Sequence, residues 1–255
     1  IFSGHAKVNL TLYETFHHYR AGVEECLKIL KAATLNVSVS DLAKDSHKLA
    51  SFVGNYAHAE LLKSWGIRPS AVVGLGRGKD VATCVVGLAK LEVLLPQLAS
   101  GVPVIDIPSG RSLGIEFSSI PSDCPDIEKR LRQILKSVTT QGVECFVEIG
   151  LIDPKLSVFC SQNISKTSTW ISTDPKHGLV GQLAQLYASG IKIDWNHFDD
   201  GFSRVRVPLP TYPFQRKRYW YDAVTPVIEG PLDCHPLLDE QKPIWAHQPE
   251  TRLWE

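Results

Sequence analysis

The sequence predicts an α/β fold, in which a mostly parallel β-sheet lies between layers of helices. Apolar residues recur at three- and four-residue steps in several segments, which is typical of amphipathic helices. Short, nearly continuous apolar runs, such as residues 71–73 and 143–150, are typical of buried strands. Helical and strand patterns alternate along the chain, and this order favours a parallel sheet.

The first helices are predicted from apolar spacing. A stripe on one face predicts a helix over residues 12–30, and a second helix is expected over residues 46–66, ahead of the strand at 71–73. A third helix is expected to open at about Asp80 and to run through Leu91. Pro96 is expected to stop or kink it, because proline lacks the amide hydrogen that the helix needs.

The second half of the chain continues the pattern. We expect a strand at residues 102–107, then a loop rich in serine, glycine and proline as far as Pro125. An amphipathic helix follows over residues 127–138, the strand at 143–150 comes next, and another helix runs through residues 179–187. Prolines from Pro208 onward exclude a regular helix or a central strand.

Composition limits the possible partners. The 255 residues have a formal net charge of zero, so no overall field attracts nucleic acid or an anionic membrane. No apolar run approaches the roughly 20 residues that a membrane-spanning helix needs. We therefore expect a cytoplasmic protein with neither nucleic acid nor membrane as a partner.

The cysteines and the first residue add two expectations. Six cysteines are scattered without metal-ligand spacing, so we expect reduced thiols and no metal site. The chain opens on Ile1 and contains no methionine, so we expect it to be a piece of a longer polypeptide.

The glycine-rich stretch that runs from Gly74 to Gly78 carries the strongest functional signal. A strand, a tight glycine turn and a helix are typical of the G-x-S-x-G elbow, in which a serine is exposed at the turn. Gly76 stands at the position of that serine and has no side chain. Dinucleotide and phosphate-loop motifs fit less well, because their glycine spacing differs and Asp80 would repel a phosphate. A purely structural turn remains an alternative.

Several motifs resemble the acyltransferase region of modular type I polyketide synthases and the linker that follows it. FSGHA at residues 2–6 is similar to the family's opening F-T-G-Q-G, and LYETF at 12–16 matches its L-Y-E-T-F helix. Residues 64–74 match the approach to the elbow, and FVEIG at 146–150 resembles a late strand. The most specific match is LPTYPFQRKRYW at residues 209–220. The resemblance covers most of the chain.

The resemblance implies three regions. Residues 1–165 would form a truncated acyltransferase-like domain, residues 166–225 a post-acyltransferase linker, and residues 226–255 the start of a dehydratase-like domain. The implied fold is a three-layer acyltransferase- or α/β-hydrolase-like core with an extended linker after it. The segment between Leu95 and Val143 is too short for the family's small ferredoxin-like subdomain, so we expect that subdomain to be missing.

The departures from the family concern its catalytic groups. In active members a serine attacks malonyl-coenzyme A, a distant histidine is the base, and backbone amides hold the oxyanion. Here Gly76 replaces the serine, Leu75 the preceding histidine, and His5 the glutamine on the oxyanion side, while Arg77 follows the turn. No Ala-Phe-His-Ser motif is present, and residues 91–102 contain no arginine for the malonyl carboxylate. We therefore expect no catalytic residue and no cofactor.

These observations favour a structural role in a polyketide synthase module. The region would position a neighbouring ketosynthase and a dehydratase-like domain in cis, and a sharper hypothesis makes it a docking platform for an acyl carrier protein or a trans-acting acyltransferase. The alternative is a residual malonyl- or acyl-coenzyme A:carrier-protein acyltransferase with a non-standard nucleophile, for which Cys84, Ser109 and Ser112 are weak candidates.

The expected interdomain contacts lie in the aromatic and basic segment, which could equally fold back on its own domain. The residues expected to make them are Tyr212, Pro213, Phe214, Gln215, Arg216, Arg218, Tyr219 and Trp220.

Overall fold

The computed structural model describes most of the chain. The described residues are 1–44, 49–101, 110–112, 115–121, 124–150, 153–172, 178–204 and 207–213, together with two short strands near the C-terminus, β6 (Gln241–Pro243) and β7 (Arg252–Trp254). Contacts divide the chain into two compact units, Ile1–Val205 and Arg206–Glu255. In the second unit, β6 and β7 pair antiparallel.

The first unit contains two small sheets. In one, β1 (Ala71–Leu75) pairs in parallel with β3 (Ile115–Ile120), and β2 (Gly110–Ser112) pairs antiparallel with β3 at the edge. In the other, β4 (Cys145–Val147) pairs in parallel with β5 (Thr169–Ile171). The mostly parallel sheet predicted from the sequence is confirmed, and β2 is its antiparallel exception.

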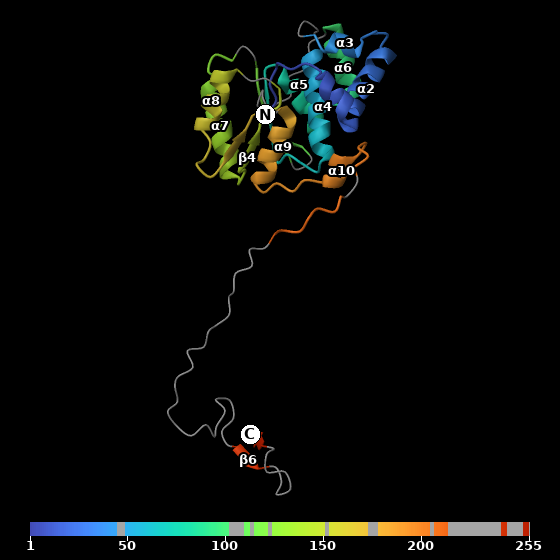
Figure 1. The fold of residues 1–255 in the computed structure, drawn as a ribbon. Helices are drawn as coiled ribbons and strands as arrows, with labels where there is room; N and C mark the ends of the chain where they lie inside the picture. Colours follow the sequence, from blue (N-terminus) through green and yellow to red (C-terminus); the bar gives the residue numbers. More distant parts are fainter. Residues whose placement is uncertain are drawn as a thin grey trace. The chain divides into compact units, whose positions relative to one another are not determined.

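The first residues of the chain join the two sheets. The Phe2 N–H donates to the Val73 carbonyl oxygen at 2.8 Å, and the Leu75 N–H donates to the Phe2 carbonyl oxygen at 2.9 Å. On the other side, the Ser3 N–H donates to the Ile149 carbonyl oxygen at 3.0 Å. Residues 1–3 therefore form a short central connection between the ends of β1 and β4, and the N-terminus lies near the middle of this unit (Figure 1).

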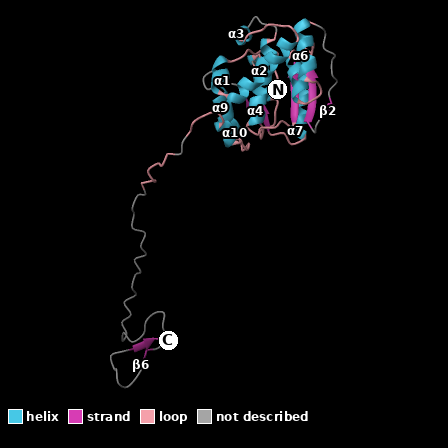
Figure 2. Ribbon diagram, turned by 90° about the vertical axis from the view of Figure 1, so that its right-hand side faces the viewer, coloured by secondary structure: helices cyan, strands magenta, loops and turns pink. Residues whose placement is uncertain are grey.

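Helices cover both faces of the joined sheet (Figures 1 and 2). Alternate residues of a strand point to opposite faces, and accordingly Val72 and Phe117 pack into one hydrophobic core while Val73 and Ile120 pack into another. The helices that line the first core include α2 (His17–Ala32), α4 (Ala50–Ser64), α5 (Gly78–Val85), α6 (Leu91–Ser100) and α9 (Gly178–Ala188). The helices of the second core are α7 (Ile127–Thr140) and α8 (Pro154–Gln162). This arrangement confirms the three-layer α/β prediction.

The first predicted helix is interrupted. Residues 12–30 were expected to form one helix, but α1 (Leu10–Thr15) and α2 are separate, because Phe16 has an extended backbone with φ −109° and ψ 115°. The Phe16 ring is buried against Trp65, with ring centroids 5.4 Å apart. Aromatic packing of this kind outweighs the continuation of one helix.

The prediction of one helix from Asp80 to Leu91 is wrong, and Pro96 does not stop the helix that contains it. The chain turns after Val85, and a new helix, α6, begins at Leu91 and continues past Pro96 to Ser100. Pro96 has no N–H to donate to the carbonyl oxygen of Glu92, four residues earlier. Glu92 is an exposed residue of the first turn of α6. Water can satisfy that carbonyl oxygen, so the helix persists.

The prediction of a loop as far as Pro125 is also wrong, because this segment contains β2 and β3. β3 includes Ser118 and Ser119, and a serine-rich sequence is typical of loops. Phe117 and Ile120 nevertheless anchor the strand in the two cores. Among the described residues between α6 and β4, β3 and α7 belong to the main layers and no separate subdomain is present. The predicted strand at residues 102–107 lies outside the described residues.

Residues assigned to the linker pack on the α/β layers. Ile171 of β5 and Leu183 of α9 are fully or almost fully buried in the first core, and Phe198 of α10 (Trp195–Asp199) packs against Trp65 with ring centroids 5.3 Å apart. Since a linker can fold against the domain that it follows, the residue boundaries of the three predicted regions stay a prediction.

Further elements that were not predicted include the single-turn helix α3 (Val39–Leu42), the helices α8 and α10, and the strand β5. None of the helices within the described ranges is long and apolar enough to cross a lipid bilayer.

Candidate functional site

The predicted elbow is present. β1 ends at Leu75, Gly76 turns the chain with φ 54°, and α5 begins at Gly78. A positive φ is unfavourable for residues with a side chain, which is why such turns are strained when they carry a nucleophile. The Gly76 N–H donates to the Ile120 carbonyl oxygen at 2.8 Å, so the turn is anchored to the end of β3.

The two glycines that flank the turn are required by packing. A Cβ atom on Gly74 would lie 2.8 Å from the Lys79 backbone nitrogen, and one on Gly78 would lie 2.6 Å from the Ser3 carbonyl oxygen. Both separations are shorter than real Cβ contacts. The strand, the helix and the N-terminal segment can therefore approach one another only because both positions are glycine.

The segment that carries His5 lies against the elbow. A Cβ on Gly4 would lie 3.3 Å from the backbone nitrogen of Arg77, so the two loops are in close contact. The Ser3 hydroxyl donates to the His5 carbonyl oxygen at 3.0 Å, and the Asn55 side-chain amide donates to the Ser3 carbonyl oxygen at 2.8 Å. Buried polar groups thus hold this loop beside the turn.

The side chains at the turn carry no nucleophile. Gly76 has none, Leu75 is buried in the second core, and Arg77 is exposed. Cys84 lies near the C-terminal end of α5, where burial, followed by repulsion from Asp80, raises the pKa of its thiol to about 12. A thiol with that pKa is protonated at neutral pH and is a poor nucleophile.

The other predicted residues fall in the second unit, in β2 or outside the described residues. Tyr212 and Pro213 are exposed, and they lie in a segment without helix or strand, as the prolines predicted. Residues 214–220, with the remaining predicted interdomain contacts, lie outside the described residues, as does Ser109. The backbone of Ser112 is part of β2.

A buried polar cluster lies near the end of β4, and the sequence did not reveal it. The His58 Nε2 atom is 3.0 Å from the Gln182 Oε1 atom, and the Gln182 side-chain amide donates to the Glu148 carbonyl oxygen at 2.8 Å. His58 lies on α4 and Gln182 on α9. The cluster therefore ties α9, in the predicted linker, to the α/β layers.

Glu148 itself has a side-chain partner in the same region. Its Oε2 atom accepts a hydrogen bond from the Ser157 hydroxyl at 2.9 Å, and the Trp170 indole N–H donates to that hydroxyl at 3.2 Å. The carboxylate is buried but bound within a chain of donors, which favours a structural role over general acid–base chemistry.

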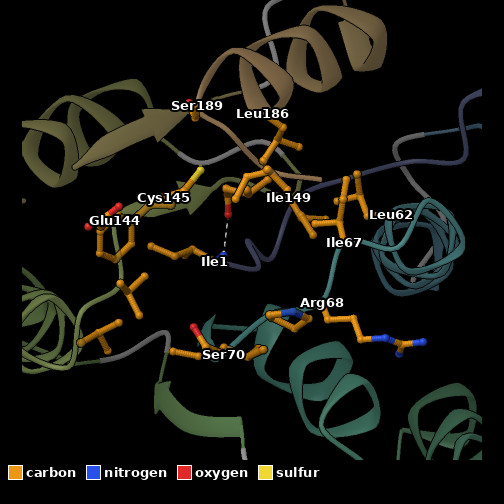
Figure 3. Close-up of a pocket in the computed structure, with 18 of the residues that line it drawn as sticks. Ile1, Leu62, Ile67, Arg68, Ser70, Glu144, Cys145, Ile149, Leu186 and Ser189 are labelled. Atoms are coloured by element: carbon orange, nitrogen blue, oxygen red, sulfur yellow. Dashed lines mark hydrogen bonds between the residues drawn. The ribbon is translucent and has the colours of Figure 1, made fainter. Parts of the chain in front are cut away.

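Two cavities have linings that include none of residues 74–78. A cavity of about 650 Å³ is lined by the beginnings of β1 and β4, and Ile1 lies inside it between Cys145 and Ser70 (Figure 3). This position is at the opposite edge of the sheet from the elbow. A second cavity, of about 450 Å³, is lined by residues that include Lys7, Tyr19 and His58. Within the described ranges, no three potential metal ligands come together.

The flanking glycines can be tested by substitution. We expect Gly74→Ala to lower the free energy of unfolding by more than about 3 kcal/mol, since the new Cβ meets the Lys79 backbone, which cannot move without displacing α5. The control is Gly142→Ala. It also adds a methyl group, at a position with φ 87° but nothing within 4 Å, and should cost only about 1 kcal/mol. If urea denaturation gave the same loss of unfolding free energy for both variants, the close packing of the elbow would be unimportant for stability.

The buried histidine predicts a pH dependence of stability. Burial lowers the pKa of His58 to about 4, below the ordinary histidine value of 6.5. The unfolded chain therefore binds this proton more readily, and stability should be full above pH 6.5 and fall as the pH decreases toward 4, by about 3 kcal/mol in all. The measurement is urea denaturation between pH 7 and pH 4. His58→Leu should remove this component of the pH dependence, while the exposed His17→Leu should keep it; identical profiles for both variants would contradict the assignment.

Sequence comparison finds relatives among polyketide synthases. A PKS-NRPS hybrid synthetase, ATPKS, of Aspergillus niger is 29% identical over 138 residues, which are 47% of this chain and 7% of that protein. A protein of Mycobacterium tuberculosis, named putative inactive phenolphthiocerol synthesis polyketide synthase type I Pks1, is 39% identical over 55 residues, 22% of this chain and 3% of that protein. The chain thus corresponds to a small part of these relatives. No protein-family model matches it.

Solved structures show the same fold. The acyltransferase domain of ZmaA superposes with a TM-score of 0.59 at 16% identity, covering 82% of this chain and 78% of that one. The acyltransferase domain from the second module of the salinomycin polyketide synthase has a TM-score of 0.56 at 16% identity, with 84% and 78% covered. The sequence relatives are polyketide synthases and the fold is that of their acyltransferase domains, which together support a polyketide synthase acyltransferase-domain fragment.

Proposed function

We propose that this chain is a catalytically inactive, acyltransferase-like region of a polyketide synthase module that positions neighbouring domains. The observation that carries the proposal is the elbow: its backbone is retained, but Gly76 stands where an acyl group would have to be attached. Covalent acyl transfer needs an activated nucleophile at that point. Without it, the fold can still hold its neighbours at a fixed distance.

The neighbouring side chains support the proposal. Cys84 is the cysteine nearest to Gly76 in the sequence. It is half-buried, and burial raises the pKa of its thiol to about 12. Cys160 is buried, and burial raises the pKa of its thiol to about 11. His58 is neutral and buried, and its Nε2 atom is 3.0 Å from the Gln182 Oε1 atom. A nucleophile and its base act as a unit, so an isolated remnant of either would give little rate enhancement.

The proposed partners follow from the relatives of this chain. Because these relatives are multidomain polyketide synthases, we place a ketosynthase and a dehydratase-like domain in cis beside this region. Because the region would not load an extender unit, a separate acyltransferase would have to deliver one. We propose that this acyltransferase or the acyl carrier protein docks here, and that the segment around Tyr212 and Pro213 contacts a neighbouring domain.

Inactivity can be tested by looking for an acyl-enzyme. We expect the purified chain, incubated with radiolabelled malonyl- or acetyl-coenzyme A, to retain no label after denaturation, because no described side chain at the turn can form the ester. A catalytically competent acyltransferase domain serves as the positive control. Stable label on this chain would support the alternative, a residual acyltransferase, and loss of that label in a Cys84→Ala variant would identify the nucleophile.

Docking can be separated from simple spacing by a binding measurement. We expect the purified chain to bind a discrete malonyl-coenzyme A-dependent acyltransferase, or an acyl carrier protein, with a dissociation constant in the micromolar range that is typical of transient assemblies, as measured by calorimetry. An unrelated protein of similar net charge is the control. Absence of heat at about 100 µM would leave positioning in cis as the role and would remove docking from the proposal.

A further inference from the structure

The second cavity, of about 450 Å³, lies beside the carboxyl ends of the strands. Its lining includes Ala6, which follows the residues that pair in parallel with β1, and Gly150, which follows β4. Helix α4 contributes His58 to the lining, and α9 contributes Leu179. In parallel α/β sheets, ligands bind outside the carboxyl ends of the strands, and a cavity of this volume is large enough for a small molecule.

The hydrogen bonds around His58 determine which of its ring nitrogens carries the proton. The Glu148 carbonyl oxygen can only accept, so the side-chain nitrogen of Gln182 faces it, at 2.8 Å. The oxygen of the same amide therefore faces the His58 Nε2 atom, at 3.0 Å, and Nε2 is the donor. His58 is neutral at pH 7, because burial lowers its pKa to about 4. The Nδ1 atom of His58 is therefore a hydrogen-bond acceptor.

This acceptor has no partner among the described residues, and it is open to the cavity. Only 9% of His58 is exposed. The described side-chain polar atoms that are sealed from solvent without a partner are Trp65 Nε1, Glu116 Oε2 and Thr139 Oγ1, and the His58 Nδ1 atom is not one of them. Since His58 lines the cavity, the space that Nδ1 reaches is the cavity itself. A buried acceptor without a hydrogen bond costs stability, so a donor at this point would be favourable.

Tyr19 supplies the complementary group. Its side chain is buried, and burial raises the pKa of its hydroxyl to about 12, so the hydroxyl keeps its proton at pH 7. The hydroxyl oxygen accepts from the Asn9 N–H at 3.1 Å, while its own proton has no acceptor among the described residues. Tyr19 and His58 both line the cavity and are not bonded to each other. The cavity thus offers one donor and one acceptor.

The walls between these two groups favour an uncharged ligand. Val8 and Leu179 are almost fully buried, and Leu12 is half-buried. Lys7 is the charged residue among the described lining, and it is exposed to solvent. The buried part of the cavity therefore has no charge that could compensate an ionised group. A hydroxyl group suits it, since one hydroxyl can accept from Tyr19 and donate to His58.

We propose that this cavity binds a small, uncharged molecule with an apolar body and one hydroxyl group, which accepts a hydrogen bond from Tyr19 and donates one to His58. Such a ligand would contact α4, α9 and the segment after residue 5, and it would hold α9 on the sheet. The proposal goes beyond the proposed function and is independent of catalytic inactivity, because the described lining includes none of residues 74–78.

The experiment uses phenol as the probe and toluene as the matched control, which has the same ring with a methyl group in place of the hydroxyl. We expect phenol to bind the full chain at pH 7 at least about 10-fold more tightly than toluene, because only phenol satisfies both buried groups. NMR titration of protein labelled with ¹⁵N-histidine measures both affinities. Phenol should also shift the Nδ1 resonance of His58, since it donates a hydrogen bond to that atom.

Matched substitutions locate the probe. Tyr19→Phe removes the donor and should weaken phenol binding at least about 5-fold without weakening toluene binding. Tyr56→Phe is the control, because it removes a hydroxyl that is bonded to Glu25 and is not part of the described cavity lining. It should leave phenol binding unchanged. His58→Phe removes the acceptor and should abolish the preference for phenol over toluene.

Three results would overturn the proposal. The first is equal affinity for phenol and toluene, and the second is an equal effect of the Tyr19 and Tyr56 substitutions on phenol binding. The third is no binding of either probe up to about 10 mM, since the cavity would then hold only water. None of these readouts involves acyl transfer, so a positive labelling experiment with malonyl-coenzyme A would overturn the inactivity without affecting this result.

Discussion

The backbone pairing of Phe2 and Ser3 is the interaction on which the rest of the structure depends. It joins β1 to the end of β4 and thereby makes one layer from two small sheets. The same two residues pack against Gly78 at the start of α5, so the joint and the elbow share one set of close contacts. The sheet, the turn and α5 therefore stabilise one another, and a change at any of these contacts would disturb all three.

This shared packing explains how an elbow can persist without a nucleophile. Gly74 and Gly78 are required by the approach of neighbouring backbone atoms, whether or not the turn performs chemistry. Gly76 differs from them, since its φ of 54° is a conformation that glycine adopts freely and other residues adopt at a cost of about 1 kcal/mol or more. A glycine at this position relieves that strain. The backbone of an elbow and a glycine at its turn are thus physically compatible.

Local patterns predicted the elements that depend on local sequence. The apolar run at 71–73, the amphipathic stripe of α7 and the glycine turn were all recognisable, and the structure contains each of them. β3 was missed because its serines suggested a loop, whereas its stability comes from Phe117 and Ile120 in two different cores. The pairing of His58 with Gln182 joins residues 124 positions apart. No local pattern contains such a contact, since it exists only once α9 has packed on α4.

The central claim is that the scaffold for acyl transfer is retained while more than one of its chemical groups is absent. The most direct measurement is the intact mass of the Gly76→Ser variant after incubation with malonyl-coenzyme A. We predict a folded protein of unchanged mass, because the sequence lacks the Ala-Phe-His-Ser motif that carries the base histidine of the acyltransferases it resembles. Rapid formation of a malonyl adduct that the unaltered chain does not form would contradict the account, since it would show that everything except the nucleophile is still in place.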